Sequence, residues 1–125
     1  MHKIINSLSA PSPIGPYSQA TLAGNTLYVS GQIPLDPKTG NLIESTIEVE
    51  TEMVMKNLSA ILSEVGADFT NVVKCSIFVK DMSDFGKINE TYGKYFQDNP
   101  PARETVEVSR LPKDVRVEIS CIAIL

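Results

Sequence analysis

The chain places polar side chains near its C-terminal end, in positions that packing alone would not select. Residues 100–120 contain two runs in which polar and apolar side chains alternate, the two-residue period of a half-buried strand. A short turn separates the runs, so we expect them to pair as a β-hairpin. In that pairing Arg103 and Thr105 share one sheet face with Glu118 and Ser120, away from the valines. A guanidinium there could hold a carboxylate, and a carboxylate could accept a proton.

A simpler explanation of this face is that it lies in water. Charged side chains on the outer face of a hairpin usually form a solvated surface and contribute little to stability. If these polar residues take part in chemistry, another part of the protein must cover this face. The elements predicted from the rest of the chain indicate what could cover it.

The composition restricts the class of protein. A chain of 125 residues fits one domain, residues 1–125, and is long enough to bury a core. Charged residues make up 21% and hydrophobic residues 42%, which is typical of a soluble globular protein without a membrane span. The N-terminus lacks the long apolar run of a signal peptide, so we expect a cytoplasmic protein. The net charge of −4 argues against a tight nucleic-acid binder.

The two cysteines and the single histidine exclude several catalytic classes. Cys75 and Cys121 fall on the parity of the aliphatic residues in alternating runs, so both are expected as core residues rather than a disulfide or a catalytic thiol. His2 lies in a terminus that is expected to fray. The sequence therefore predicts neither a zinc site nor Ser–His or Cys–His nucleophilic machinery, and it implies no metal or cofactor.

Alternating patterns indicate the strands that must position the polar residues. Gly24-Asn25 is a two-residue turn signal between two such runs, and it predicts a β-hairpin. Outside the C-terminal hairpin, we expect strands at residues 3–6, 19–23, 26–32 and 73–79.

Helical spacing of apolar residues predicts two helices. Ser45, three residues before Glu48, predicts a capping box at the start of a long helix that stops at Gly66. A second helix is expected to begin at Ser83 or Asp84. Its buried stripe is expected to consist of Phe85, Ile88, Tyr92, Tyr95 and Phe96.

Three residues depart from what their predicted surroundings require. Gly31 is a weak strand residue, and it often marks a bulge or the close approach of another group. Asn89 lies beside the stripe of the second helix, where it is either a satisfied amide at the helix edge or part of a polar site. Tyr17 ends a loop constrained by prolines, so it either lies beside a pocket or packs on the edge of the core.

The order of elements predicts an α+β fold, with a mixed six-stranded sheet and both helices on one face. The other face is expected to be partly apolar and partly charged, which suggests self-association. A site shared between subunits would then cover Arg103 and Glu118. The residues expected on this face are Tyr28, Phe78, Ile122 and Ile124, among Lys74, Ser76, Arg116 and Glu118.

Seven linked motifs, spread over nearly the whole chain, resemble the RidA (YjgF) family of reactive intermediate deaminases. They are Ile14–Ala20 (Ile-Gly-Pro-Tyr-Ser-Gln-Ala), Ser30–Pro34 (Ser-Gly-Gln-Ile-Pro), Val79–Met82, Asn89–Tyr92, Pro101–Arg103 with Val106–Val108, Leu111–Asp114, and Val117–Ile119. The resemblance implies a chorismate-mutase-like trimeric fold with active sites between the subunits of a homotrimer. It also implies hydrolysis of 2-imino acids or enamines, such as 2-aminoacrylate and 2-iminobutyrate, to 2-keto acids and ammonia, which protects pyridoxal-phosphate enzymes.

The same resemblance assigns roles to individual residues. Arg103 is similar to the arginine that binds the substrate carboxylate, and Glu118 to the carboxylate that orients the attacking water. Around them, the resemblance implies Tyr17 as an aromatic lid, Ser30 and Gly31 as the pocket strand, Asn89 as the pocket amide, and Thr105 as a further pocket position.

The chain also departs from the family pattern. Thr105 stands where cysteine is common, which argues that no thiol is needed, and Ser120 replaces a frequent glutamate. The segment before Pro100 is shorter than in some relatives. Two other classes of function stay open: a ribonuclease or translation inhibitor, and a non-catalytic ligand-sensing regulatory protein.

Overall fold

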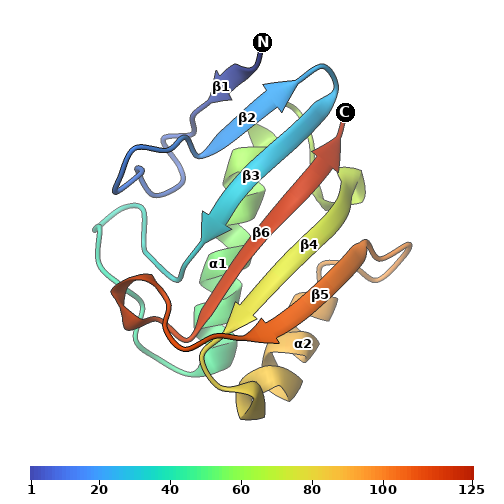
Figure 1. Ribbon diagram of the computed structural model, residues 1–125. Helices are drawn as coiled ribbons and strands as arrows, with labels where there is room; N and C mark the ends of the chain where they lie inside the picture. Colours follow the sequence, from blue (N-terminus) through green and yellow to red (C-terminus); the bar gives the residue numbers. More distant parts are fainter.

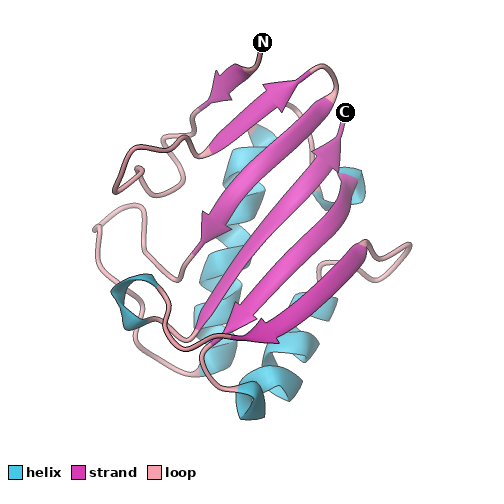
Figure 2. Ribbon diagram, viewed as in Figure 1, coloured by secondary structure: helices cyan, strands magenta, loops and turns pink.

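Six β-strands form one mixed sheet in the computed structural model, which describes residues 1–125, and both α-helices lie on one face of it (Figure 1). The strands are β1 (Lys3–Ile5), β2 (Ala20–Ala23), β3 (Thr26–Gln32), β4 (Val72–Val79), β5 (Ala102–Glu107) and β6 (Val117–Ile124), and the helices are α1 (Ile47–Ser63) and α2 (Phe85–Gly93). Figure 2 shows the two layers, sheet and helices. The predicted α+β architecture is confirmed.

The strand order is β1-β2-β3-β6-β4-β5, which places β6 between β3 and β4 (Figure 1). The predicted hairpin is confirmed: β2 pairs with β3 in antiparallel register, and Gly24 at the turn has φ of +61°. The pairing of β3 with β6 shifts register between Val29 and Gln32, so the bulge that Gly31 indicated is present.

The predicted C-terminal hairpin is wrong, because β4 lies between β5 and β6. Helix α2 connects β4 to β5, and such a crossover joins parallel neighbours, which is how these two strands pair. The two-residue period indicated strands but not their partners. As a result Arg103 is paired with Cys75 on the helix face, whereas Glu118 is paired with Phe78 and points to the other face.

The core lies between the sheet and the two helices. Val117 and Ile119 of β6 are fully buried in it, whereas Val106 of β5 is 40% exposed, so the valines do not share a face. Cys75 and Cys121 are buried, free and directly opposite each other across β4 and β6. Burial raises the pKa of the Cys121 thiol to about 12, which agrees with the predicted role of a core residue.

The start of α1 differs from the prediction by one residue. The N-cap is Thr46, whose hydroxyl accepts a hydrogen bond from the Val49 amide at 3.2 Å, so the expected capping box at Ser45 is wrong. The Ser45 amide instead donates to the carboxylate of Glu50 at 3.1 Å. The helix ends near Gly66, whose φ of +70° is the left-handed conformation that glycine adopts freely.

The second helix is preceded by a 3₁₀ turn at Met82–Asp84. Asp81 caps this turn by accepting a hydrogen bond from the Ser83 amide at 2.9 Å, so neither Ser83 nor Asp84 supplies the side-chain cap that the sequence indicated. In the predicted stripe Ile88, Tyr92 and Phe96 are buried.

No helix covers the second face of the sheet (Figure 2). Tyr28 is 49% exposed there and Ile124 is 37% exposed, which agrees with the predicted apolar component of this face. Lys74 contributes charge by pairing with Glu104 at 2.8 Å. Arg116 was expected on this face, but it pairs with Glu50 of α1 on the helix side.

Neither helix combines the length and the apolar character that crossing a bilayer requires.

Candidate active site

A cavity of about 360 Å³ lies where β3 and β6 adjoin. It contains Tyr17, Ser30, Gly31 and Glu118, which are four of the seven predicted site residues. Its remaining wall is formed by Ile14, Ile33 and Pro112. These three side chains were not predicted, although each lies inside one of the motifs that indicated the family.

Glu118 is the carboxylate of this cavity. Its carboxylate packs directly on Gly31, where an added Cβ would lie 2.5 Å from Oε2. The close approach suggested by a glycine inside a strand is therefore present. Glu118 is half-buried, its side chain makes no hydrogen bond or ion pair within the chain, and burial raises the pKa of its carboxyl group. A carboxylate prepared in this way is a candidate general base.

Tyr17 lies beside the cavity rather than in the core, with a side chain that is 48% exposed. A tight local turn sets its position: the Tyr17 amide donates to the Gly15 carbonyl at 2.8 Å, and the Ile14 amide donates to the Tyr17 hydroxyl at 3.3 Å. The Ser30 hydroxyl donates to the Ser18 carbonyl at 2.6 Å. Ser30 therefore supports the loop that carries Tyr17, in addition to lining the cavity.

Arg103 lies on β5, over the aromatic residues of α2. Its guanidinium carbon is 5.1 Å from the centre of the Tyr92 ring and 5.4 Å from that of Phe85. Its Nη1 donates to Oδ1 of Asn89 at 2.6 Å. Cation–π contacts and one amide hold this exposed cation in place, and no carboxylate neutralises it. The Asn89 amide thus contacts Arg103, another of the predicted site residues.

Thr105 lies on the same strand as Arg103, opposite Ile77 of β4. Its hydroxyl oxygen is buried and has no hydrogen-bond partner, and the same is true of the Tyr92 hydroxyl oxygen. Burial also raises the pKa of the Tyr92 hydroxyl. Thr105 therefore shares the strand of Arg103, but its hydroxyl group is buried.

The seven predicted site residues form two groups on opposite faces of the sheet. One group is the cavity with Glu118, and the other is the Arg103 group with Asn89 and Thr105. The prediction that Arg103 and Glu118 share a face is wrong, since it depended on the hairpin that β4 interrupts. A single chain therefore does not bring both groups to one small ligand.

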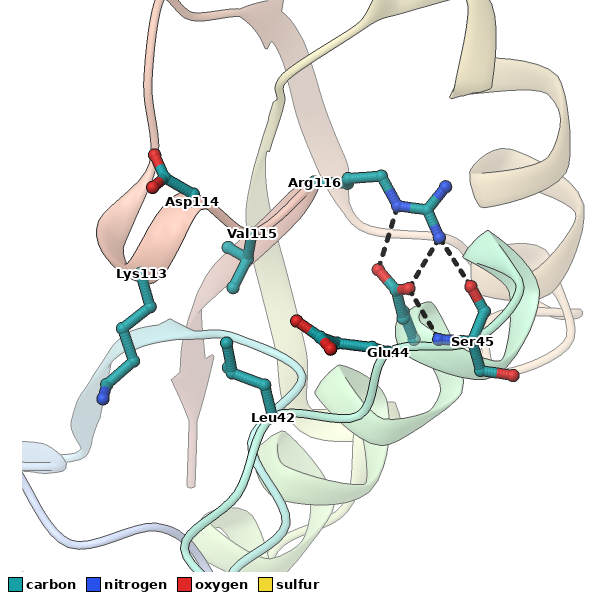
Figure 3. A pocket seen from close by; sticks show the side chains of 8 residues that line it. Leu42, Glu44, Ser45, Lys113, Asp114, Val115 and Arg116 are labelled. Carbon is teal, nitrogen blue, oxygen red and sulfur yellow. Dashed lines mark hydrogen bonds and ion pairs between the residues drawn. The ribbon is translucent and has the colours of Figure 1, made fainter.

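A second hollow, of about 370 Å³, lies between the start of α1 and residues 113–116 (Figure 3). Arg116 donates through Nη2 to the Glu50 carboxylate at 2.6 Å and to the Ser45 carbonyl at 2.8 Å. Figure 3 shows Arg116 pointing toward Ser45. Glu50 also accepts from Nε of Arg116 and from the Ser45 amide, so its hydrogen-bonding capacity is largely used. This pair ties α1 to the residue that precedes β6, and the Glu50 carboxylate serves as its structural partner. Sequence analysis missed it, because residues so far apart in sequence give no periodic signal.

The chain matches the family described as Endoribonuclease L-PSP over residues 7–125. It is 51% identical to a RutC family protein of Pyrococcus horikoshii over 123 residues, which cover 98% of each chain. It is 48% identical to the 2-iminobutanoate/2-iminopropanoate deaminase of Rattus norvegicus over 124 residues, which cover 99% of this chain and 90% of the rat protein.

A solved structure from Thermotoga maritima, described as that of a candidate endoribonuclease, has the same fold. It superimposes with a TM-score of 0.97 at 47% sequence identity, covering 100% of this chain and 98% of the other. The fold and the site thus define an α+β protein of the L-PSP class. The chain belongs to this family, which is the RidA (YjgF) family that its motifs resemble.

Proposed function

We propose that this protein is a deaminase that hydrolyses 2-imino acids and their enamine tautomers, such as 2-iminobutyrate and 2-aminoacrylate, to 2-keto acids and ammonia. The observation that carries the proposal is a pair of opposite charges, each held in place and each without a charged partner in the protomer. Arg103 is the cation and Glu118 is the carboxylate. The name of the rat relative supports the same chemistry.

Arg103 is suited to bind the carboxylate of an imino acid. Asn89 occupies Nη1, which leaves Nε and Nη2 free to donate two parallel hydrogen bonds. The aromatic rings beneath the guanidinium fix its plane, so the ligand's carboxylate and its imine carbon are fixed as well. Fixed geometry of this kind accounts for much of the rate of a bimolecular reaction.

Glu118 is suited to accept a proton from the attacking water. As the water oxygen bonds to the iminium carbon, the π electrons of the C=N bond move to nitrogen and Glu118 takes the proton. Glu118 then returns its proton to the nitrogen of the resulting carbinolamine, and the C–N bond breaks as a lone pair of the hydroxyl oxygen forms the carbonyl of the 2-keto acid. The departing ammonia takes the hydroxyl proton, so the products are the 2-keto acid and ammonium, and Glu118 is again a carboxylate. Partial burial keeps the pKa of Glu118 above its ordinary range, which strengthens the carboxylate as a base.

This mechanism requires that protomers share the site, because Arg103 and Glu118 of one chain lie on opposite sheet faces. We propose the homotrimer that the family resemblance implies, with the uncovered faces bearing Tyr28 and Ile124 turned toward one another. Light scattering tests the assembly directly. A trimeric mass is expected at micromolar concentration, and a stable monomer would rule out both the trimer and the shared site.

An endoribonuclease is the second candidate, because the family carries that description. The chain has 11 Lys and Arg residues against 15 Asp and Glu residues, which gives no concentrated basic face for a phosphate backbone. A non-catalytic sensor that uses Arg103 to bind a carboxylate is the third.

Three measurements separate these three functions. A threonine dehydratase generates 2-iminobutyrate, and the release of 2-ketobutyrate is followed with and without this protein. We expect faster release with the native chain and no acceleration with Glu118→Gln. A native chain that binds 2-ketobutyrate without accelerating its release would indicate the sensor, and cleavage of an RNA substrate by the native chain would indicate the ribonuclease.

A further inference from the structure

Gln19 is a buried amide that the proposed chemistry does not use. Its side chain is 2% exposed, and every polar atom of it has a partner. The Oε1 atom accepts a hydrogen bond from the Ser7 amide at 2.6 Å. The Nε2 group faces three carbonyl oxygens, those of Ser7 at 3.1 Å, Ala10 at 3.4 Å and Pro11 at 2.9 Å. Gln19 therefore binds the main chain of residues 7–11 from the inside.

The loop that Gln19 holds is the one that ends in Tyr17. Every other hydrogen bond made by residues 8–17 stays within residues 7–17, so the Gln19 side chain is their hydrogen-bonded link to the sheet. Ala10 adds a packing contact with the core. Beyond Pro11, two further prolines limit the backbone freedom of the loop, so a fixed residue 11 restricts where residue 17 can lie.

Gln19 is itself fixed to the strand that faces Glu118. Its carbonyl accepts a hydrogen bond from the Ser30 amide at 2.9 Å, and the next residue of β3 is Gly31, against which Glu118 packs. The Ser30 hydroxyl adds its bond to the Ser18 carbonyl at 2.6 Å. A short chain of contacts thus connects the wall that carries Glu118 to the loop that carries Tyr17.

We propose that Gln19 is a positioning residue of the active site: its side-chain amide sets the place of Tyr17 relative to Glu118 and so controls the fit of the substrate without touching it. The kinetic consequence rests on the proposed deaminase function. The fixed position of Tyr17 does not, so the two can fail separately.

The test uses a fluorescent reporter in place of Tyr17. The chain has no tryptophan, so Tyr17→Trp introduces a single indole at the loop. Gln19→Met, which keeps the size of the side chain and removes its hydrogen bonds, is then added. We expect the anisotropy of the indole to fall and its quenching by acrylamide to rise at least about twofold. Leu62→Ala is the matched control, since it destabilises a fully buried position near the C-terminal end of α1 and should leave both indole signals unchanged.

Kinetics of the chain with native Tyr17 give a second readout. Gln19→Met should raise KM for the imino acid by roughly five- to tenfold and leave kcat within about twofold, because the reacting groups are intact and the fit is looser. A purely structural role would lower kcat through loss of folded protein and leave KM unchanged. Unchanged indole quenching in a folded Gln19→Met variant would overturn the proposal.

Hydrogen exchange of the native chain provides a test that needs no variant. The Ser7 amide donates only to the Gln19 side chain, so it should exchange as slowly as the amides of β2. Exchange at the rate of an unprotected loop would contradict the anchor. Slow exchange of the Ser7 amide in a protein that does not hydrolyse imines would support the role of Gln19 in holding the loop and would contradict the proposed deaminase function.

Discussion

The Glu118 cavity holds a carboxylate and the Arg103 group holds a guanidinium, and different physical interactions determine the surroundings of each. The cavity is partly buried and brings together residues that are far apart in the sequence, and loss of solvent makes its carboxylate more basic. The Arg103 group is exposed and comes from one β4–α2–β5 unit, where aromatic rings and an amide hold the guanidinium. Each group lacks the partner that the other offers, which is the expected arrangement of a site divided between protomers.

The difference also predicts different kinetic effects. Loss of Glu118 should remove chemistry and retain binding, because desolvation prepares a base. Loss of Arg103 should weaken binding and rate together, because the guanidinium holds the ligand in both the ground state and the transition state.

The largest effect is expected from Glu118→Gln. The amide keeps the shape and one acceptor but cannot take a proton, so kcat should fall by roughly 10²-fold or more. Isothermal titration should still detect binding of 2-ketobutyrate. Glu90→Gln, on the exposed side of α2, is the control and should be fully active. Near-normal turnover of Glu118→Gln would show that the water has another base, and loss of ligand binding together with the trimer would indicate an interface ion pair instead.

These two regions also show how far sequence reasoning reaches. Gly31 indicated a bulge and a close approach, and both are present, because the residue type itself reports a lack of space at that position. The placement of Arg103 failed, because alternation specifies the two faces of a strand but not its neighbour. The helix expected between β4 and β5 is the kind of connection that joins parallel strands, so it favours the pairing of β5 with β4. The short turn before β6 favoured the pairing of β5 with β6 instead, and it was the weaker signal.

Other features of the site had no local signal. Phe85 and Tyr92 were expected as buried residues of a helix, and they do face inward, but their contact with Arg103 depends on the pairing of β4 with β5. The Arg116–Glu50 pair depends on the whole topology in the same way. Motifs located the polar residues, whereas contacts between distant elements required the structure.

A smaller loss is expected from Arg103→Ala. The ligand loses a bidentate, charge-assisted contact, so kcat/KM should fall by about 10- to 100-fold. Arg103→Lys should recover little of this, because an ammonium group keeps the charge but not two parallel donors. Steady-state kinetics of both variants would measure the loss, with Lys87→Ala on the exposed side of α2 as the control. Full rescue by lysine would mean that the charge alone matters.

Gly31→Ala tests the wall behind the carboxylate. An added Cβ would lie 2.5 Å from Oε2 of Glu118, so the carboxylate must move and kcat should fall by about tenfold. Gly86→Ala in α2 is the matched control, because an added Cβ there meets nothing within 4 Å. A crystal structure and kinetics of both variants would measure the shift. Unchanged kinetics with a displaced Glu118 would separate the carboxylate from the chemistry.

The smallest change is expected in the pH dependence. Burial raises the pKa of Glu118 above the ordinary 4.5, so the base is lost by protonation as the pH falls, and the acid limb of kcat/KM should lie above pH 4.5. The stability of the fold depends on pH in the opposite direction. Burial favours the neutral carboxyl group of Glu118, so its contribution to the free energy of unfolding is present at low pH and is lost as the pH rises through the raised pKa. Both dependences should be absent in Glu118→Gln. An unchanged acid limb in that variant would assign the limb to another group.

The division of the site between protomers is the central claim, and mixing two impaired variants tests it most directly. Arg103→Ala and Glu118→Gln protomers are unfolded together in equal amounts, refolded and assayed for 2-ketobutyrate release. If each site takes Arg103 from one chain and Glu118 from its neighbour, random assembly restores both groups in roughly a quarter of the sites. The account predicts recovery to about a quarter of native activity, well above either variant alone. Activity no greater than the average of the two variants, in particles shown to contain both chains, would contradict it.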